Sequence, residues 1–465
     1  MTVNNGQVDR FLPFTRPDDM RGVLEQHVPA LFGHAVRISS CEIVQTYWKT
    51  FAKSHSVDKS TLSICYRLGL IDHLGQSCGE RLLYLKAYLG GRSHTAFKDV
   101  DHARSVAPNS GTAVLHMPDL DAVAWRFPND PGLPHLPDVV ERERLVAHLP
   151  YAVLGLGECG PRDIRKIDRE IINYRPELRC TTRIELQLAR PDGPCRLVLY
   201  AKTFKADAGR VIYDRMQELW RASLDKPGGL EVAQPLAYDP SIKTIWQLGV
   251  DGTPLGRMFD AGNCAHYVDQ IAHGLARLHR STLPTDAIAS VEGHLAELTK
   301  KTAKIRRHLP RFGPKLSQIE ADLARALQRL PQRRHHLIHG DFHIGQLLVG
   351  RDRIVFFDFD ELAIGDPAQD LANFIVDLQS ANCASHVVEQ VRVLLPQAYA
   401  RHSGEEVPEG WLNWHVLLQL ANKAYRCFLR HEPDLVANLG SLFCEIERAR
   451  KMLRETVGQQ GRRAA

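Results

Sequence analysis

Three polar side chains between Asp341 and Asp358 are of the types that phosphoryl transfer requires. A carboxylate (Asp341), a side-chain amide (Gln346) and a second carboxylate (Asp358) flank two short apolar runs. Phosphoryl transfer needs an acid anion that accepts the proton of the attacking hydroxyl, and hard oxygen ligands that hold the magnesium ion of the triphosphate. The residue types therefore indicate this chemistry.

The two apolar runs predict the elements that position these side chains. Leu347–Val349 and Ile354–Phe357 have the composition of two strands joined by the turn Gly350–Arg353. A hairpin brings the residue before its first strand and the residue after its second strand to the same end. We therefore expect Gln346 and Asp358 to lie together, where both could ligate one ion.

Five short motifs follow one another in this part of the chain, and their order resembles a known family. They are His339-Gly340-Asp341, Gln346, Asp358-Phe359-Asp360, Gly365-Asp366-Pro367 and Asp370-Leu371-Ala372. The set resembles the catalytic segment of the aminoglycoside phosphotransferase and choline kinase-like superfamily, whose members have a protein-kinase-like fold. Ordered sets of motifs are far more specific than single ones.

The resemblance implies a role for each matching residue. Asp341 is expected to be the catalytic base and Asp358 a magnesium ligand, with Asp360 as an additional ligand or a neighbour of the ligands. The superfamily usually has Asn where this chain has Gln346, and the pattern HGD-x-H-x-GQ over residues 339–346 resembles the maltokinase branch. A Gln oxygen is the same type of ligand as an Asn oxygen on a longer side chain, so metal binding at this position is compatible with Gln346. The cofactors that the resemblance implies are ATP and Mg²⁺.

Upstream, three apolar runs predict the sheet of a kinase-like small lobe. Lys202 lies inside the third run, where an ammonium group is partly desolvated and needs a partner. The next predicted helix, Gly209–Ala222, offers Glu218, with Asp214 as the alternative in another helix register. A strand Lys paired with a helix Glu is the arrangement that places Lys on the α- and β-phosphates. The predicted strands are Ile167–Asn173, Cys180–Leu188 and Arg196–Phe204.

The loops around this sheet offer further candidates for contact with the nucleotide. The turn Tyr174–Arg179 between the first two strands contains no glycine, so it offers no glycine-rich cradle for phosphate; its arginines either touch phosphate or face water. The strand Thr244–Leu248 is expected to lead into the hinge between lobes. The backbone of Gln247 and Gly249 is expected to bond adenine.

The chain after the hinge is predicted to be helical, which completes an α+β, bilobal protein-kinase-like fold. Trp411 and Trp414 either stack on a sugar ring or belong to the core of a helix. Apolar residues at helical spacing predict helices over Tyr267–Leu278, Leu295–Leu309, Leu316–Leu330, Trp411–Leu429 and Leu442–Val457.

The first 150 residues contain what looks like a copy of the small lobe. The run Leu83–Tyr88 (LYLKAY) echoes Leu199–Phe204 (LYAKTF), which aligns Lys86 with Lys202. Two unrelated β-meanders of similar composition are the alternative. If the copy is degenerate, exposure to water rather than an ion pair should relieve the desolvation of the Lys86 ammonium, and no nucleotide-sized cleft should face Lys86.

These patterns predict three domains. Residues 1–150 would form the N-terminal cap, degenerate and small-lobe-like. Residues 151–250 would form the kinase-like small lobe, and residues 251–465 the helical large lobe with the catalytic and metal motifs.

Composition limits the remaining classes of function. The net charge is +5 over 465 residues with scattered basic residues, which does not indicate a nucleic-acid partner. The ten cysteines form no CxxC pair, which favours reduced thiols. No secretory signal pattern and no membrane-spanning apolar run are visible, so we expect a cytoplasmic protein without a membrane partner. The oligomeric state stays open.

Together the motifs predict an ATP-dependent phosphotransferase that acts on a hydroxyl of a small molecule, a sugar or amino sugar. The alternative is a catalytically inactive kinase-like module that binds nucleotide and acts through interactions. Gln346 and the absence of a glycine-rich loop favour this alternative, whereas retention of Lys202, Asp341 and Asp358 argues against it.

Overall fold

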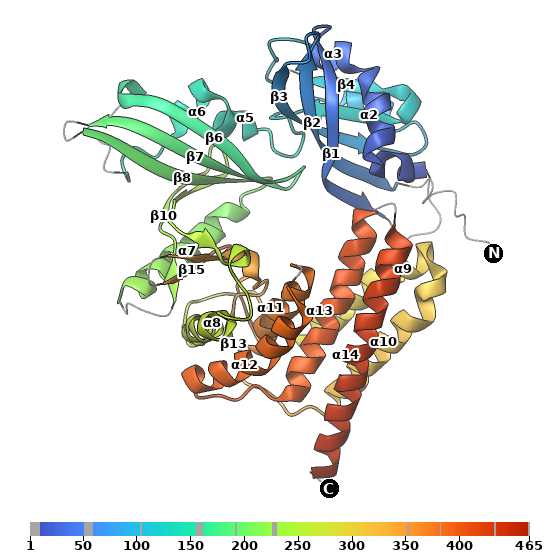
Figure 1. The fold of residues 1–465 in the computed structure, drawn as a ribbon, viewed down its shortest axis with the longest axis vertical. Coiled ribbons are helices and arrows are strands. Elements are labelled where there is room, and N and C mark those ends of the chain that lie inside the picture. Colours follow the sequence, from blue (N-terminus) through green and yellow to red (C-terminus); the bar gives the residue numbers. More distant parts are fainter. Residues whose placement is uncertain are drawn as a thin grey trace. The chain divides into compact units, whose positions relative to one another are not determined.

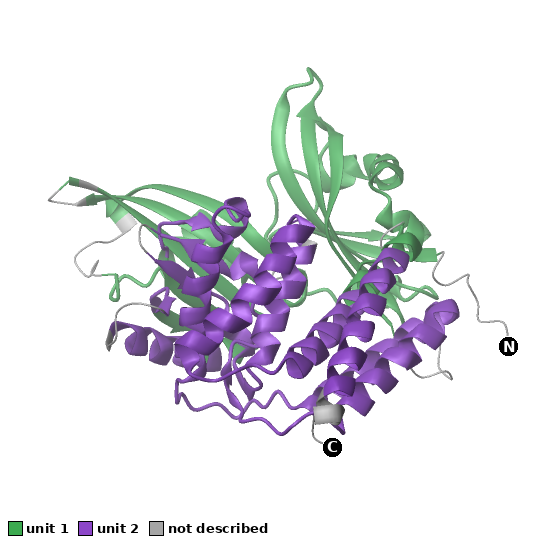
Figure 2. Ribbon diagram, turned by 60° about the horizontal axis from the view of Figure 1, so that its bottom comes forward, with its two compact units in different colours: residues 1–210, 236–248, 426–438 green, residues 211–235, 249–425, 439–465 purple. Residues whose placement is uncertain are grey.

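The structure, a computed structural model, describes residues 10–50, 59–102, 105–154, 161–190, 193–225, 230–350, 353–381, 383–431 and 434–463. The chain divides into two compact units, which Figure 2 colours separately. The first consists of Met1–Arg210, Leu236–Leu248 and Arg426–Asn438, and the second of Val211–Pro235, Gly249–Tyr425 and Leu439–Ala465.

The first unit begins with short helices and an antiparallel sheet of five strands (Figure 1). The strand order is β1-β2-β3-β5-β4. The elements are α2 (Pro17–Glu25), α3 (Val28–Phe32), β1 (Val36–Lys49), β2 (Thr61–Asp72), β3 (Ser77–Ala87), α4 (Ser93–Lys98), β4 (Val114–Met117) and β5 (Ala122–Arg126).

A second five-stranded sheet in the same unit has the order β10-β11-β8-β7-β6. Read from its β6 edge, this order corresponds strand by strand to that of the first sheet, and a helix follows the third strand in both. The three strands predicted here are confirmed, each a few residues longer. The elements are α5 (Leu136–Val140), α6 (Arg142–His148), β6 (Ile164–Arg175), β7 (Arg179–Arg190), β8 (Gly193–Phe204), β10 (Pro235–Asp239) and β11 (Thr244–Leu248). The helix after β8, α7 (Ala208–Asp225), belongs to the second unit from Val211 on.

Apolar residues at every second position hold the second sheet on its core. In β7, Ile184 and Leu186 are completely buried, and Leu188 is 1% exposed. Alternate residues of a strand point to one face, so these side chains pack on the same side, with residues of α5 and α6 and with Trp246 of β11. This packing gives the strand that carries Lys202 a rigid neighbour.

The second unit is largely helical and also holds small strands. The five predicted helices are present, together with α11, which contains the last of the five motifs, and α12, which follows it. The helices are α8 (Cys264–His279), α9 (Val291–His308), α10 (Gly313–Leu327), α11 (Ala368–Ser380), α12 (Ser385–Ser403), α13 (Glu409–Arg430) and α14 (Leu435–Arg463). The strands are β9 (Glu231–Val232), β12 (Thr253–Pro254), β13 (His336–Ile338), β14 (Leu347–Val349), β15 (Ile354–Phe356) and β16 (Ala363–Gly365).

The predicted α+β, protein-kinase-like fold class is confirmed: a five-stranded antiparallel sheet with a helix after its third strand precedes a helical unit that carries the catalytic hairpin. None of the described helices combines the length and apolar character that a membrane crossing requires. The nine cysteines within the described ranges are free thiols.

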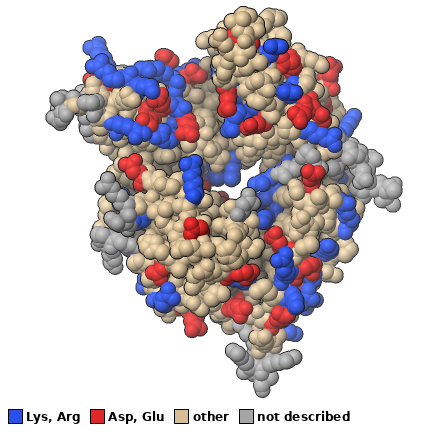
Figure 3. All heavy atoms as spheres, in the orientation of Figure 1, with Lys and Arg blue, Asp and Glu red and all other residues tan. Residues whose placement is uncertain are grey.

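Basic side chains gather over strands β6 to β8 on the face seen in Figure 3. Several of them are paired with acidic neighbours on the same strands. Arg183 and Arg196 both bind Glu185, and Lys166 binds Asp168. Side-chain hydrogen bonds from Arg196 and Arg183 lower the pKa of Glu185 to about 2. Much of this charge is therefore neutralised locally.

Candidate active site

The catalytic hairpin has the predicted geometry. β14 pairs with β15 in antiparallel register, with Leu347 opposite Phe356. The next backbone bond, from Phe357 N to Gln346 O, is 3.0 Å long. Gln346 and Asp358 therefore lie at the same end of the hairpin, as expected. Residues 351 and 352 of the predicted turn lie outside the described residues.

The loop that carries Asp341 has a backbone shape that requires glycine. Gly340 has φ +86°, and a Cβ at this position would lie 2.2 Å from the carbonyl oxygen of Glu361. Any larger residue would meet both left-handed strain and a backbone clash. This turn leaves Asp341 exposed, which is what a base that meets an external hydroxyl requires.

Asp370, at the start of α11, holds this loop from inside the core. One oxygen of its completely buried carboxylate accepts the backbone N–H of His339 at 2.7 Å, and the other accepts the N–H of Gly340 at 2.9 Å. The Nε2 atom of buried His279 donates to Asp370 Oδ2 at 3.0 Å. Asp370 therefore braces the loop through backbone N–H groups.

The electrostatics of Asp370 favour its charged form. Burial acts to raise the pKa of this carboxyl, but the hydrogen bond and charge of His279, with the charge and backbone N–H of His339, outweigh burial. The net effect is a pKa below the ordinary value of 3.8. A buried anion with several donors is held firmly in one geometry.

Two further side chains of α11 fix the loop, and the sequence analysis missed both. Gln369 Nε2 and Asn373 Nδ2 each donate to the carbonyl oxygen of Gly340 at 3.0 Å. Their spacing of four residues places them on one face of the helix. That spacing is a detectable signal, although polar residues at such spacing are common on helices.

His339 connects the base loop to the hairpin. Its ring is completely buried, and Nε2 donates to the carbonyl oxygen of Phe357 at 2.9 Å. Phe357 immediately precedes Asp358, and His339 lies two residues before Asp341. The backbone segments that carry the two carboxylates are therefore joined directly.

Gln346 is engaged in a way that the sequence did not indicate. Its Oε1 atom accepts the backbone N–H of His343 at 3.1 Å. Its Nε2 atom is buried and has no hydrogen-bond partner among the described residues. The amide oxygen has a second lone pair that could still meet a cation. One lone pair of the predicted ligand oxygen is nevertheless already engaged by the backbone N–H of His343.

Asp358 has a backbone conformation that is rare outside glycine. Its φ and ψ are 63° and 54°, in the left-handed region, and its side chain does not cap the short helix that follows. Strain of this kind is typically retained at functional sites. Asp358 and Asp360 are both partly exposed. With Gln346 they form a set of hard oxygen donors, which fits Mg²⁺. No group of three or more His, Cys, Asp or Glu suited to a metal occurs among the described residues.

The predicted nucleotide-binding residues belong to the predicted elements. Lys202 is a partly buried residue of β8, paired with Thr181 of β7 and Ile245 of β11. Glu218 lies on α7, and Gln247 lies in β11, which ends at Leu248 just before Gly249. Lys202 and Gln247 belong to the first unit, Glu218 and Gly249 to the second. The Lys202–Glu218 pair and the adenine contacts stay predictions.

The two tryptophans of α13 belong to the core. Trp414 is completely buried, and its indole N–H donates to the carbonyl oxygen of Leu323. Trp411 is 7% exposed and donates to the carbonyl oxygen of Pro331. Since neither ring offers a free face, stacking on a sugar ring is excluded, and the core alternative is the correct one.

The turn between β6 and β7 does something that the sequence analysis did not foresee. Glu177 at this turn binds Lys86 of the first sheet, with 2.6 Å between Nζ and Oε1. Tyr84 Oη donates to the same oxygen at 3.0 Å. The expectation that Lys86 lacks an ion pair and is relieved by water is wrong. The partner comes from a turn of the other sheet rather than from a following helix.

The backbone of Glu177 is fixed as firmly as its side chain. Its φ is 61°, in the left-handed region, and its N–H donates to Asp130 Oδ2 at 2.9 Å. Tyr174 Oη donates to the same oxygen at 2.7 Å. A Cβ on Gly132 would lie 2.4 Å from Glu177 Cα, so the approach requires glycine there. We call the Lys86–Glu177 pair with these supporting groups the clasp.

Comparison with known proteins finds a family match over the part of the chain that carries the predicted catalytic motifs. Residues 212–411 match the sequence model of the phosphotransferase enzyme family. This range contains Asp341, Gln346, Asp358 and Asp370 but neither Lys202 nor the first sheet. No curated protein matches the chain.

Several solved structures resemble the chain at low identity. A choline kinase from Cryptosporidium parvum is 14% identical, with 67% of this chain and 96% of that chain covered and a TM-score of 0.48. An aminoglycoside phosphotransferase from Streptomyces rimosus is 19% identical, with 59% of this chain and 97% of that chain covered and a TM-score of 0.39. An ethanolamine kinase from Plasmodium vivax is 14% identical, with 71% of this chain and 95% of that chain covered and a TM-score of 0.42. With TM-scores below 0.5, these likenesses do not bear on the substrate.

Proposed function

We propose that this chain, whose residues 212–411 match the model of the phosphotransferase enzyme family, transfers the γ-phosphate of ATP to a hydroxyl group of a small molecule. The observation that carries the proposal is the network centred on Asp370. It fixes the backbone before Asp341, and His339 joins that backbone to the residue before Asp358. Phosphoryl transfer depends mainly on positioning, which such a network supports.

Each predicted residue then has a defined task. Asp341 would orient the acceptor hydroxyl and accept its proton as the oxygen attacks. Lys202 would hold the α- and β-phosphates, with Glu218 fixing the ammonium. The backbone of Gln247 and Gly249 would bond adenine.

The donor set supports a magnesium requirement. Asp358, Asp360 and the remaining lone pair of Gln346 would hold the ion. When bound, magnesium supplies neutralisation of the charge on the phosphate oxygens. The engaged Oε1 of Gln346 makes the two carboxylates the dominant ligands.

A sugar or amino sugar is the acceptor class that we propose. The basis is the resemblance of residues 339–346 to the maltokinase pattern, in which Gln346 is the distinguishing residue. Because Trp411 and Trp414 are buried, recognition of a sugar would depend on polar groups rather than on these rings.

A second candidate function is a catalytically inactive module that binds nucleotide. The observation that favours it is Gln346, whose amide oxygen is bonded to His343 while its amide nitrogen is buried and unpartnered. A metal site weakened in this way could bind nucleotide without turnover.

ATP consumption with and without magnesium, over a panel of sugars, amino sugars and aminoglycosides, tests the proposal. With an accepted substrate, Asp341→Asn should lower turnover at least ~100-fold, the scale of losing a general base. ATP affinity, measured by calorimetry, should stay unchanged, because the substitution retains size and fold. Lys202→Met should weaken ATP binding as well.

The matched control is Asp286→Asn, an exposed carboxylate in the same unit. It should leave turnover unchanged. Near wild-type turnover of Asp341→Asn would overturn the base assignment. ATP binding without magnesium-dependent turnover on any acceptor would support the inactive module instead.

A further inference from the structure

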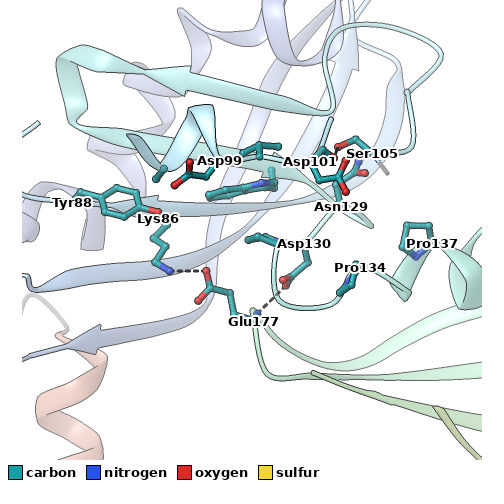
Figure 4. A pocket seen from close by; sticks show the side chains of 14 residues that line it. Lys86, Tyr88, Asp99, Asp101, Ser105, Asn129, Asp130, Pro134, Pro137 and Glu177 are labelled. Atoms are coloured by element: carbon teal, nitrogen blue, oxygen red, sulfur yellow. Dashed lines mark hydrogen bonds and ion pairs between the residues drawn. The ribbon is translucent and has the colours of Figure 1, made fainter. Parts of the chain in front are cut away.

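The first unit contains a cavity of about 390 Å³ that no part of the proposed phosphotransfer reaction uses. Figure 4 shows the Lys86–Glu177 pair along one side and the carboxylates of Asp99 and Asp101 along the other. The volume lies in the range of small-molecule sites. The expectation that no nucleotide-sized cleft faces Lys86 is therefore wrong.

The charge of the cavity excludes a nucleotide as its natural occupant. Its described lining carries four carboxylates and one ammonium group. Lys86, the only cation of that lining, already binds Glu177 at 2.6 Å. The excess of negative charge would repel a triphosphate and attract a cation.

Asp130 and Glu177 have tasks within the protein, and Asp101 also takes part in an interaction there. Asp130 is saturated by four donors, namely the backbone N–H groups of Gly132, Leu133 and Glu177 and the hydroxyl of Tyr174. Glu177 belongs to the clasp. Asp99, in contrast, is exposed, and within the described part of the chain its carboxylate has no hydrogen bond or ion pair. It is the carboxylate most available to a ligand.

The walls of the cavity are apolar and stiff. Pro131, Pro134 and Pro137 form one side, and proline fixes the backbone before any ligand arrives. The rings of Tyr88 and Trp125 belong to the lining too, and Trp125 is locked by stacking on Tyr84 at 5.1 Å between ring centroids. Rigid apolar and aromatic walls suit a compact organic body, since little ordering is needed on binding.

We propose that this cavity binds a small organic cation, with its ammonium group at Asp99 and its apolar body against the proline and aromatic walls. The end of the ligand nearest the clasp would meet Glu177, which sits at the β6–β7 turn. Binding would therefore stabilise that turn of the second sheet.

Three probes of one shape test the charge requirement by calorimetry: naphthylmethylammonium, naphthylmethanol and naphthylacetate. The cation should bind at least ~10-fold more tightly than the alcohol, equivalent to ~1.4 kcal/mol. Naphthylacetate should show no saturable binding. Equal affinities, tightest binding of the carboxylate, or no saturable binding of the cation would each overturn the proposal.

Substitutions at Asp99 assign the binding to the cavity. Asp99→Asn should weaken binding of the cation by ~3- to 5-fold and leave the affinity for the alcohol unchanged, as expected for one partly solvated ion pair. Asp99→Lys should weaken binding of the cation further. Asp119→Asn, an exposed carboxylate outside the cavity, is the matched control and should change nothing. If both Asp99 variants bind the cation as the wild type does, the assignment fails.

Hydrogen exchange gives a second readout that does not depend on catalysis. The cation should slow exchange in residues 174–179, whose turn carries Glu177, and in residues 96–101 of the opposite wall. Protection confined to other parts of the chain would overturn the assignment. Since no ATP is present, this experiment can fail or succeed independently of the proposed phosphotransferase activity.

Discussion

Replacing Lys86 by Met removes the cation of the clasp while retaining most of the aliphatic side chain. The side chains of Lys86 and Glu177 are 18% and 25% exposed, so solvent screens the pair only partly. Hydrogen bonds to charged groups contribute ~1.5–3 kcal/mol, whereas fully exposed ion pairs contribute ~0–1 kcal/mol. With Tyr84 as an additional donor, we expect a coupling of ~1.5–2 kcal/mol between Lys86 and Glu177.

A double-mutant cycle measures this coupling locally. Wild type, Lys86→Met, Glu177→Gln and the double variant are compared by hydrogen exchange over residues 174–179. Exchange reports the free energy of local opening, which avoids assuming that a chain of two units unfolds in one step. Lys86→Met should speed exchange by roughly 10- to 30-fold, since ~1.4 kcal/mol corresponds to tenfold. The double variant should exchange little faster than either single variant.

The control is Lys98→Met, which removes an exposed ammonium from α4 of the same sheet. It should leave exchange over residues 174–179 unchanged. Additive effects of Lys86→Met and Glu177→Gln, to within ~0.5 kcal/mol, would show that the two groups do not interact in solution and would refute the reasoning.

Three further predictions concern the second unit. Asp358→Ala should abolish magnesium-dependent ATP binding in calorimetry, and Gln346→Ala should weaken it less because a neutral amide contributes no charge; equal ATP affinity in all variants would contradict the ligand assignment. Gly340→Ala should lower both turnover and the melting temperature, since its Cβ would lie 2.2 Å from Glu361 O at φ +86°; Gly345→Ala, whose nearest contacts are the ring of His343, should be milder. Because the pKa of Asp370 is lowered in the folded state, its contribution to stability is fully present above the ordinary value of 3.8 and is lost as the pH falls through the lower folded value. Asp370→Asn should lower the free energy of unfolding by ~3–5 kcal/mol at neutral pH. Below about pH 4, the melting temperature of this variant should depend less on pH than that of the wild type.

The elements that the sequence predicted well are those with a clean local period. The β14–β15 hairpin was found because each of its strands is a short continuous apolar run, and strands β6 to β8 because their apolar residues alternate. β1, in contrast, was not predicted. It is an edge strand with register shifts after Ile38 and Ile43, and most of its residues are partly or fully exposed. The bulges interrupt the alternation, and exposure removes the apolar signal.

The parts of the site that the sequence could not supply depend on contacts between distant segments. Asp370 belongs to one of the five motifs that the sequence shows. Gln369 and Asn373 belong to none, and their bonds to Gly340 O span 29 and 33 residues. The engaged amide of Gln346 was missed for another reason. Its bond to His343 arises from a short helical turn that the loop adopts only in the folded state.

The two sheets show how far a sequence repeat determines chemistry. Both third strands carry a Lys followed two positions later by an aromatic ring, with the ammonium 5.9 Å from the Tyr88 centroid in one and 5.6 Å from the Phe204 centroid in the other. The repeat thus reproduces the strand, the lysine and its aromatic neighbour, all of which are local. The partner of Lys86 is not local: it lies 91 residues away, on a left-handed turn that a buried carboxylate and a glycine make possible. The partner of Lys86 is therefore determined by the turn at Glu177, and a similar strand sequence around Lys202 does not require the same kind of partner.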